Sequence, residues 1–347
     1  MVQSLGVDLG DLVSREKVTL EQLSGRSIAV DGYNSLYQFL AIIRGPSGEP
    51  LMDRQGRVTS HLSGLLYRTT NLAEKGIRLV YVFDGVPPSL KEAEIKRRSR
   101  TKEEALVKYE EALARGDLQE AKRYAQATSR VKDQMVEDAK RLLDALGIPW
   151  IQAPSEGEAQ AAFIARKGDV WAAASQDYDS LLFGAPYLVR NLAIGGRRKL
   201  PRREAYVEVE PEIVELSKVF SELGITREQL VDLGILVGTD YNPDGVKGVG
   251  PKTALKLLKE HGSIENILPI IQAEFPEDPL KIRRLFLDPE VTTDYSLKWR
   301  EPNPEEVVQF LCRERDFSEE RVRNAVERMI SGLRAHEQKR TLDSFFR

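Results

Sequence analysis

The chain has 347 residues, 41% of them hydrophobic and 30% charged, which suffices for a sizeable buried core and roughly two domains. The formal net charge of −3 excludes an overall basic signature of nucleic-acid binding but does not exclude local basic clusters. A single cysteine, Cys312, excludes an intrachain disulfide and a cysteine-cluster zinc site. No apolar run approaches the ~20 residues of a membrane span, and we see no signal peptide, so we expect an intracellular protein that is not secreted.

Strands and helices alternate along the chain. Short apolar runs predict strands at residues 27–31, 77–85, 148–154 and 169–175, with further strands near the sheet edge at 187–192 and 203–210. Helical spacing of apolar residues predicts helices at residues 34–43, 60–76, 137–147 and 155–168. This alternation indicates an α/β fold in which helices flank a mostly parallel central sheet.

Acidic side chains gather where the predicted strands end. The six are Asp31, Asp84, Glu156, Glu158, Asp177 and Asp179. Ligands of open α/β sheets bind at this edge, and converging carboxylates repel each other unless a counter-charge lies between them. Hard oxygen ligands suit Mg²⁺ or Mn²⁺. We therefore predict a site for two metal ions, roughly 3.5–4 Å apart, that clamps a phosphodiester.

Each of these acids also has an ordinary interpretation. An aspartate after a strand is commonly a turn residue or a helix N-cap. Ser155 and Glu158 fit the S-x-x-E capping box, and Glu156 fits a favourable charge at a helix N-terminus. The D-Y-D triplet resembles the motif of phosphatases with an aspartyl nucleophile, but Leu181 stands where these have Thr or Val. The joint occurrence of six acids favours the metal site.

A basic segment interrupts the alternation. The sequence KRRSRTK at 96–102 has five basic residues and no acid, and it lies in a polar, helix-prone insertion at 89–132. The ordinary alternative is a solvated charged helix. A cationic arm close to Asp84 suits a polyanion that must be threaded towards the metals.

Glycines separate two apolar helical segments at 227–238 and 252–262. They are Gly245, Gly248 and Gly250, and the flanking basic residues are Lys247, Lys252, Lys256 and Lys259. An ordinary turn between helices is the alternative. The G-x-G-x-K-x-A spacing favours a helix-hairpin-helix element at 226–262, which holds duplex backbone without reading bases. Asp240, just upstream, would add a seventh carboxylate. A third basic stretch, at 195–204, fits a phosphate contact and an exposed hairpin equally well.

Taken in order, several motifs resemble those of the flap endonucleases, the archaeal and eukaryotic nucleases that process 5′ flaps. They are IAVDGYNSLYQFL, TSHLSGLLYRT, VYVFDGVPP, APSEGEAQAA, ASQDYDSLLFG, ILVGTDYNPDGVKGVGPKTAL and KRTLDSFF. The resemblance extends over nearly the whole chain, from Gly6 to Phe346.

The resemblance implies two Mg²⁺ ions, for which Mn²⁺ can substitute. The matching ligands are Asp31, Asp84, Glu156 and Glu158 for the first ion and Asp177, Asp179 and Asp240 for the second. Lys91 and Arg98 match basic residues that stabilise charge on the scissile phosphate. Together with Asp179, they are the catalytic residues that the resemblance implies.

The resemblance also implies DNA contacts. Tyr37 matches an aromatic residue that stacks on a base, although sequence alone favours a core tyrosine. Arg68 and Arg190 match residues that hold duplex backbone, and residues 59–62 match a pocket for a one-nucleotide 3′ flap. The insertion at 89–132 corresponds to a helical arch. Gly245, Gly248, Gly250 and Lys252 correspond to an element that holds the downstream duplex and binds K⁺.

The two ends of the chain depart from the family pattern. The tail at 336–347 resembles a sliding-clamp (PCNA) binding box, in which Leu342, Phe345 and Phe346 fill the apolar positions. Lys339 replaces the usual glutamine, so we expect a flexible tail that binds the clamp more weakly. An ordinary disordered terminus is the alternative. The family begins Met-Gly, whereas Gly6 here follows MVQSL, which is either a native extension or a start assigned too early.

The whole pattern implies a nuclease core at 1–330, with an N-terminal region at 1–110 and an internal region at 120–260. The expected activity is that of a monomeric structure-specific 5′ flap endonuclease with 5′–3′ exonuclease activity in DNA replication and repair. Its expected location is the cytoplasm of an archaeon or the nucleus of a eukaryote. The rivals are a related nuclease of the superfamily and a non-catalytic adaptor that binds DNA junctions and the clamp.

Overall fold

In the computed structural model, the described residues are 6–193, 195–199, 206–271, 275 and 277–345, with side chains left out at 196–199, 206–208 and 339–345. The N-terminal part contains β1 (Glu16–Lys17), β2 (Ser27–Asp31), α1 (Gly32–Ile42), α2 (Ser60–Glu74) and β3 (Arg78–Phe83). The middle contains α3 (Glu92–Ala114), α4 (Leu118–Ala127), α5 (Asp133–Ala145), β4 (Trp150–Gln152), α6 (Gly157–Arg166), β5 (Ala172–Ala174), α7 (Asp179–Leu182) and β6 (Tyr187–Arg190). The C-terminal part contains β7 (Gly196–Lys199), β8 (Tyr206–Val209), β9 (Glu212–Glu215), α8 (Leu216–Leu223), α9 (Arg227–Val237), α10 (Pro251–His261), α11 (Ile264–Ile271), α12 (Pro279–Leu287), α13 (Pro304–Val308) and α14 (Glu319–Phe345).

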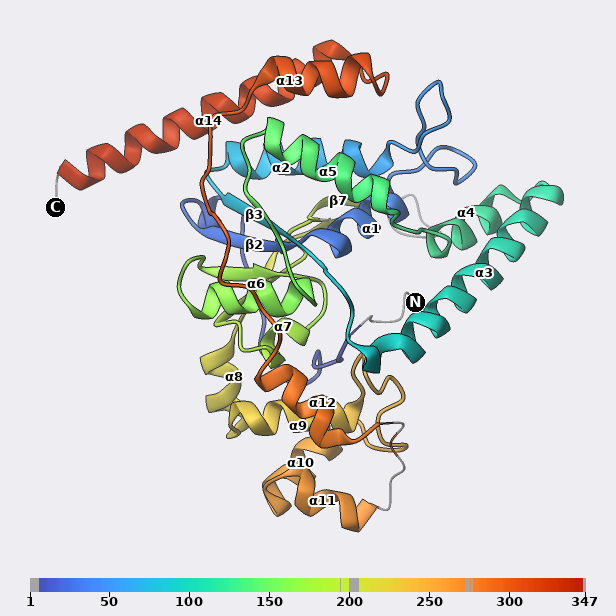
Figure 1. The fold of residues 1–347 in the computed structure, drawn as a ribbon, viewed down its shortest axis with the longest axis vertical. Helices are drawn as coiled ribbons and strands as arrows, with labels where there is room; N and C mark the ends of the chain where they lie inside the picture. Colours follow the sequence, from blue (N-terminus) through green and yellow to red (C-terminus); the bar gives the residue numbers. More distant parts are fainter. Residues whose placement is uncertain (1–5, 194, 200–205, 272–274, 276, 346–347) are drawn as a thin grey trace.

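A seven-stranded sheet in the order β1-β9-β6-β5-β2-β3-β4 forms the centre of the molecule (Figure 1). The pairs β4–β3, β3–β2, β2–β5 and β5–β6 are parallel, whereas β6–β9 and β9–β1 are antiparallel. The predicted α/β fold with a mostly parallel sheet is confirmed. The carboxyl ends of the parallel strands therefore lie at one edge.

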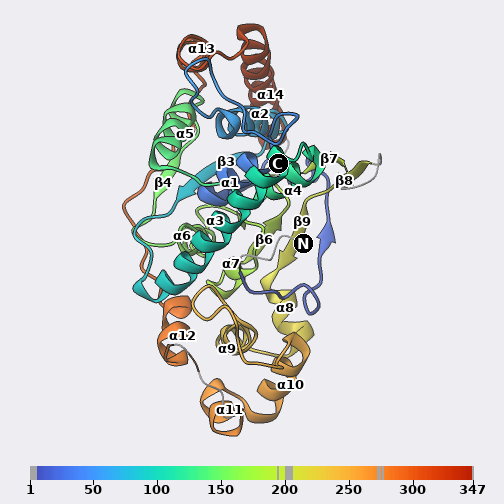
Figure 2. The same ribbon diagram turned by 90° about the vertical axis from the view of Figure 1, so that its right-hand side faces the viewer.

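The central strands β2, β3 and β5 are buried on both faces, which explains why they are almost continuously apolar. Within β2, Ile28 and Val30 pack with α1, α2 and α5, while Ala29 packs with α6 on the opposite face. Helices α13 and α14 lie outside α2 and α5, and α8 to α12 form the other end of the molecule (Figures 1 and 2). None of the helices in the described part is long and apolar enough to span a lipid bilayer.

One strand prediction is wrong in its placement. Residues 203–210 were expected near the edge of the main sheet, but β8 pairs only with β7, in a separate two-stranded hairpin. The antiparallel place beside β6 is taken by β9, which follows Pro211 and was not predicted. In the third basic stretch, residues 196–199 form β7, and residues 200–204 lie outside the described residues.

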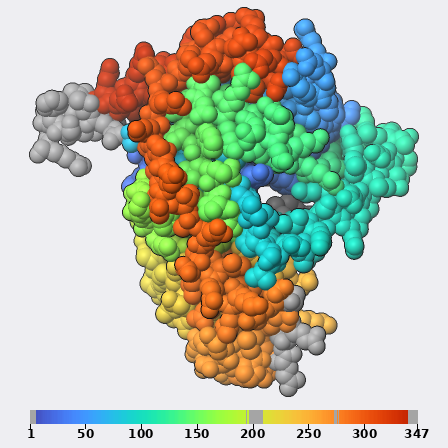
Figure 3. Space-filling view, in the orientation of Figure 1, coloured from blue at the N-terminus to red at the C-terminus, as the bar shows by residue number. Residues whose placement is uncertain are grey.

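The insertion at 89–132 forms a long helix, α3, and a shorter one, α4, that pack against each other and stand away from the sheet (Figure 1). In the space-filling view, this helical arch and the core enclose an opening (Figure 3). The glycine-rich segment lies between α9 and α10. Gly245 has φ +54°, and an added Cβ there would lie 2.2 Å from the carbonyl oxygen of Val237, so only glycine fits this turn.

Candidate active site

The seven predicted acids converge at the carboxyl ends of the parallel strands, and we call them the carboxylate edge. Their members are Asp31, Asp84, Glu156, Glu158, Asp177, Asp179 and Asp240. Asp31 ends β2, Asp84 follows β3, Glu156 and Glu158 begin α6, and Asp240 follows α9. The fold therefore brings together acids that lie more than 200 residues apart in the sequence.

Asp177 and Asp179 explain the D-Y-D triplet. Both carboxylates are almost fully buried, at 9% and 4% exposure, on the connection from β5 to α7. Tyr178, between them, is turned to Arg190, whose guanidinium donates to the tyrosine hydroxyl at 2.7 Å and lies over its ring. The side chain of Tyr178 points away from those of its two neighbours, so the two aspartates interact with each other while the tyrosine packs against Arg190.

Backbone amides orient two members of the carboxylate edge. The Asp84 carboxylate accepts a hydrogen bond from the N–H of Gly157 at 2.6 Å, at the start of α6. The Asp179 carboxylate accepts one from the N–H of Val7 at 2.8 Å. An added Cβ on Gly6 would lie 2.7 Å from Asp179, so the N-terminal segment approaches this acid closely. Residues 1–5 lie outside the described residues.

Burial and mutual repulsion raise the pKa of four of these acids. Burial, then Asp84 and Asp177, raise the pKa of Asp31 well above its ordinary value. Burial, then Asp179 and Asp31, do the same to the pKa of Glu158. Burial, then Asp240 and Asp177, raise the pKa of Asp179. The pKa of Asp84 is also raised by its burial.

Two basic side chains from the base of the arch engage the carboxylate edge. Lys91 forms ion pairs with Glu156 and with Asp240, the latter at 2.9 Å. Burial alone would lower the pKa of Lys91, but Asp240 and Glu156 raise it above its ordinary value. Arg98 pairs with Asp240 and, at 2.8 Å, with Glu94. Both predicted cations therefore lie at the site.

The donor set fits divalent metal ions. All seven acids offer hard oxygen ligands, and the buried Oε1 atom of Glu158 has no hydrogen-bond partner in the structure. Within the described residues, no group of three or more His, Cys, Asp or Glu side chains is arranged to hold a metal ion as it stands. Lys91 and Arg98 instead supply the positive charge at Glu156 and Asp240.

The capping-box interpretation of Glu158 is wrong. The N-cap of α6 is Glu156 rather than Ser155, and the side chain of this N-cap residue makes no capping hydrogen bond. Asp31, in contrast, is both a member of the carboxylate edge and the N-cap of α1, where it accepts a hydrogen bond from the N–H of Asn34. The ordinary interpretation of an aspartate after a strand thus holds here alongside the functional one.

The predicted DNA contacts lie around this edge, and protein groups engage three of them. The ammonium of Lys102, on α3, lies 5.0 Å from the ring centre of Tyr37 on α1. The guanidinium of Arg68 donates to the carbonyls of Leu192 at 2.6 Å and Gly195 at 3.0 Å. Burial lowers the pKa of Arg68 to about 10.

The remaining predicted contacts are Arg190, the glycine turn with Lys252, and the clamp-binding box. Arg190 donates to the carbonyl of Gln176 at 3.0 Å, next to Asp177. Gly248 has φ +83° and Gly250 is the N-cap of α10, so both belong to the turn, and Lys252 is exposed in the first turn of α10. In the clamp-binding box, the backbone of α14 runs through the positions Lys339, Leu342 and Phe345, and Phe346 lies outside the described residues.

Sequence reasoning missed several neighbours of the acids. The hydroxyl of Tyr241 donates to Glu156, and the Asn34 amide donates to Asp177 at 3.3 Å. Tyr241 adjoins Asp240 and Asn34 lies three residues after Asp31, so adjacency to an acid was the available signal. Nothing local in the sequence indicates the contact between Val7 and Asp179, because it joins segments 172 residues apart.

Known proteins match this chain over most of its length. The family models described as the XPG N-terminal domain and the XPG I-region match residues 2–105 and 147–240. Flap endonuclease 1 of Hyperthermus butylicus is 61% identical over 96% of both chains, and that of Pyrococcus horikoshii is 55% identical over 99% of this chain and 98% of its own.

Solved structures share the fold. The flap endonuclease-1 from Methanococcus jannaschii aligns with a TM-score of 0.75 at 42% identity, covering 95% of this chain and 99% of its own. The catalytic core of Rad2 in complex with DNA substrate aligns with a TM-score of 0.69 at 24% identity, over 91% of this chain and 96% of its own, which supports the fold alone. With its site, its motifs and these full-length relatives, the chain belongs to the flap endonuclease family of structure-specific, metal-dependent nucleases.

Proposed function

We propose that this structure-specific 5′ flap endonuclease hydrolyses one phosphodiester near the base of a 5′ DNA flap, using two Mg²⁺ ions at the carboxylate edge. Asp31, Asp84, Glu156 and Glu158 would hold the first ion, and Asp177, Asp179 and Asp240 the second. The observation that carries the proposal is the convergence of seven acids whose burial raises several of their pKa values. When bound, the ions would supply counter-charge for the phosphate and acidify an attacking water.

Lys91 and Arg98 would exchange partners when substrate binds. Both lie at the base of α3 and are paired with Glu156 and Asp240. With Glu156 and Asp240 holding divalent ions, Lys91 and Arg98 would be free to face the scissile phosphate, where their positive charge would stabilise the developing negative charge. Their position at the foot of the arch suits a single strand that passes through the opening of Figure 3.

Contacts outside the edge would place the DNA. Gly245, Gly248, Gly250 and Lys252 would hold the downstream duplex through its backbone, with K⁺ as a bound ion of the turn. Tyr37 would stack on a base beside the cut after Lys102 leaves its ring. Arg68 and Arg190 would hold duplex backbone. Because their donors already engage protein groups, we expect Arg68 to act mainly by shaping the loop after β6 and Arg190 by shaping the segment after β5.

The tail would bind a sliding clamp through Leu342, Phe345 and Phe346, with Lys339 in place of the usual glutamine. We also propose a monomer with additional 5′–3′ exonuclease activity in replication and repair. The first half of α14 packs on α2 through Val322, Val326 and Met329, so this helix would anchor such a tail to the core.

Cleavage of an end-labelled double-flap DNA in Mg²⁺ tests the proposed function, with single-stranded and blunt duplex DNA as controls. The proposal expects the protein to cut the flap near its base and to leave the two control substrates largely intact. The Asp179→Ala variant should bind the same junction without cutting it. If the wild type binds the junction but does not cut it, the protein is a junction-binding adaptor and the proposal is wrong.

A further inference from the structure

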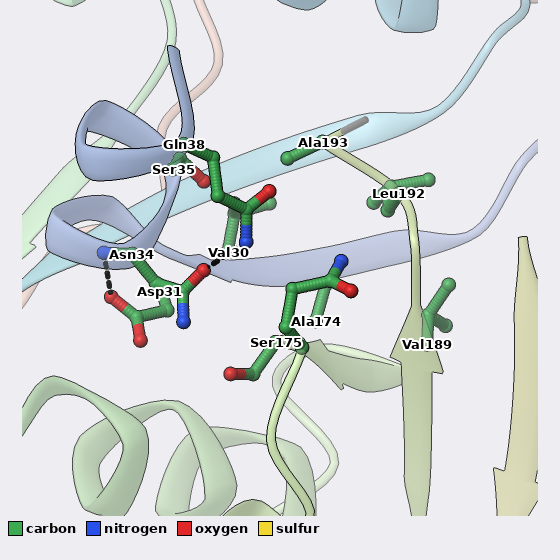
Figure 4. A pocket seen from close by; sticks show the side chains of 11 residues that line it. Val30, Asp31, Asn34, Ser35, Gln38, Ala174, Ser175, Val189, Leu192 and Ala193 are labelled. Atoms are coloured by element: carbon green, nitrogen blue, oxygen red, sulfur yellow. Dashed lines mark hydrogen bonds between the residues drawn. The ribbon is translucent and has the colours of Figure 1, made fainter. Parts of the chain in front are cut away.

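A small pocket beside the carboxylate edge has received no role so far. It lies between the first turns of α1 and the ends of β5 and β6, and amide side chains line much of it (Figure 4). These amides are Asn34, Gln38 and Gln176, and they lie next to Asp31 and Ser175. The amides face the ends of the same strands that supply the acids.

Asn34 contacts two acids that belong to different halves of the edge. Its backbone N–H donates to the Oδ1 atom of Asp31 at 2.9 Å, and its side-chain Nδ2 donates to the Oδ2 atom of Asp177 at 3.3 Å. In the proposed function, Asp31 belongs to the first metal ion and Asp177 to the second. One residue in the first turn of α1 thus fixes an oxygen in each ligand set.

Gln38 determines which way the Asn34 amide points. The Nε2 atom of Gln38, one helical turn later, donates to the Oδ1 atom of Asn34 (Figure 4). Because the amide oxygen of Asn34 already accepts this hydrogen bond, its NH₂ group is left to face Asp177. The three side chains form a directed series from Gln38 through Asn34 to Asp177, held by the i, i+4 spacing of a helix.

A neutral donor suits this position better than a charged one. A lysine or arginine beside Asp177 would compete with a metal ion for the carboxylate, as Lys91 does at Glu156. An amide fixes the carboxylate orientation and adds no net charge. Hydrogen bonds that orient metal ligands typically change metal affinity by about 10–100-fold when they are removed.

We propose that Asn34, aligned by Gln38, is a positioning residue for the metal centre, which orients Asp177 and Asp31 to bind divalent ions. This inference rests on the proposed function, because the acids are metal ligands only in that proposal. The alternative is that Asn34 merely satisfies the N-terminus of α1, in which case it affects stability but not metal affinity.

The test measures Mn²⁺ affinity by electron paramagnetic resonance on the full-length, DNA-free protein. Asn34→Leu keeps the approximate size and the backbone N–H that bonds Asp31 but removes the side-chain amide that bonds Asp177, and it should weaken Mn²⁺ binding by about 10–100-fold. Gln38→Met should weaken it in the same direction by a smaller factor. Asn266→Leu is the matched control, because this amide donates to the carbonyl of His261 at 2.8 Å, at the far end of the molecule.

Two further readings separate positioning from a structural role. The metal-free thermal midpoint of Asn34→Leu should stay close to that of the wild type, and its loss of flap cleavage should be recovered at high Mg²⁺ concentration. A lowered midpoint with unchanged Mn²⁺ affinity would overturn the inference. If Asn34→Leu does not fold, unchanged Mn²⁺ affinity of Gln38→Met overturns it instead. Failure of the wild type to bind Mn²⁺ would refute the metal centre of the proposed function itself.

Discussion

The carboxylate edge and the ion pair between Asp138 and Arg315 bury charge in opposite ways. At the edge, like charges are gathered and several pKa values are raised. In the ion pair, the Nη2 atom of Arg315 donates to both carboxylate oxygens of Asp138, at 3.0 and 2.9 Å, and both residues are 8% exposed. The ion pair joins α5 to the segment before α14, and each partner satisfies the other.

The difference separates a part of the molecule built for stability from a part built for chemistry. A paired buried charge is costly to break, because removal of one partner leaves the other uncompensated. A cluster of like charges costs stability in the metal-free protein and becomes favourable only when cations bind. Substitutions at the carboxylate edge should therefore affect cleavage more than stability, and substitutions at the ion pair should affect stability more than cleavage.

The largest effect on cleavage is expected for Asp179→Ala. Flap cleavage should fall by about 10²–10³-fold or more, because Asp179 would hold the second metal ion in the proposed site. The metal-free thermal midpoint should stay unchanged or rise, because repulsion with Asp177 and Asp240 is relieved. Asp144→Ala, an exposed acid, is the control. A large drop in midpoint with cleavage retained would contradict the assignment of this acid to catalysis.

Arg315→Met should reduce stability strongly and cleavage little. It leaves Asp138 buried without its partner, so chemical denaturation should show a loss of about 3–5 kcal/mol in the free energy of unfolding. Cleavage should be nearly normal at temperatures where the variant stays folded. Arg313→Met removes a pair with Glu319 in which Arg313 is 61% exposed, and it should cost at most about 1 kcal/mol. Equal losses in the two variants would refute the comparison.

The buried side chain of His61 makes the free energy of unfolding depend on pH. Burial lowers its pKa to about 4 from 6.5, and neither ring nitrogen has a hydrogen-bond partner in the structure. Between these values the unfolded chain binds more protons than the fold, so stability is full above pH 6.5 and falls towards pH 4. The expected loss is about 3 kcal/mol.

The carboxylate edge changes stability with pH in the opposite direction to His61, because raised acid pKa values make the folded protein bind more protons than the unfolded chain. The metal-free protein is therefore destabilised by its edge as pH rises above the ordinary range of Asp and Glu. Comparison of His61→Leu with the wild type cancels this shared contribution. Denaturation curves from pH 4 to 7 should show a shallower loss towards low pH in the variant, and parallel curves would refute the role of His61.

Tyr241→Phe should have the smallest effect. It removes a buried hydroxyl that donates to Glu156 and keeps the aromatic contact with Phe286. We expect a loss of about 1.5 kcal/mol in the free energy of unfolding and a weaker response to added Mg²⁺. Tyr295→Phe removes a surface hydrogen bond to Asp169 and serves as the control. If both variants respond to Mg²⁺ as the wild type does, Tyr241 does not orient Glu156.

The carboxylate edge could be predicted because parallel topology alone places strand ends together. Once the apolar run at 27–31 and its neighbours are recognised as parallel strands, Asp31, Asp84 and Asp177 must meet, whatever the details of packing. The glycine turn was equally accessible, because Gly245 has a backbone conformation that other residues rarely adopt.

The contacts that orient the acids could not be predicted in this way. Val7 reaches Asp179 only because the N-terminal segment lies across the sheet edge, and Tyr241 reaches Glu156 from a different element. The strand that pairs with β6 is β9 rather than the one predicted at 203–210. Which strand pairs at a sheet edge depends on tertiary contacts rather than on the local sequence pattern. Sequence thus indicates which groups converge, and the fold determines how each is held.

The central claim is tested most directly by counting the divalent ions that bind when the metal-free protein is titrated. Titration with Mn²⁺, followed by electron paramagnetic resonance, should give two ions per wild-type chain and fewer in Asp179→Ala. Binding should also raise the thermal midpoint, because cations relieve the repulsion at the carboxylate edge. Wild-type protein that binds no Mn²⁺, or that binds it equally well without Asp179, would contradict the account.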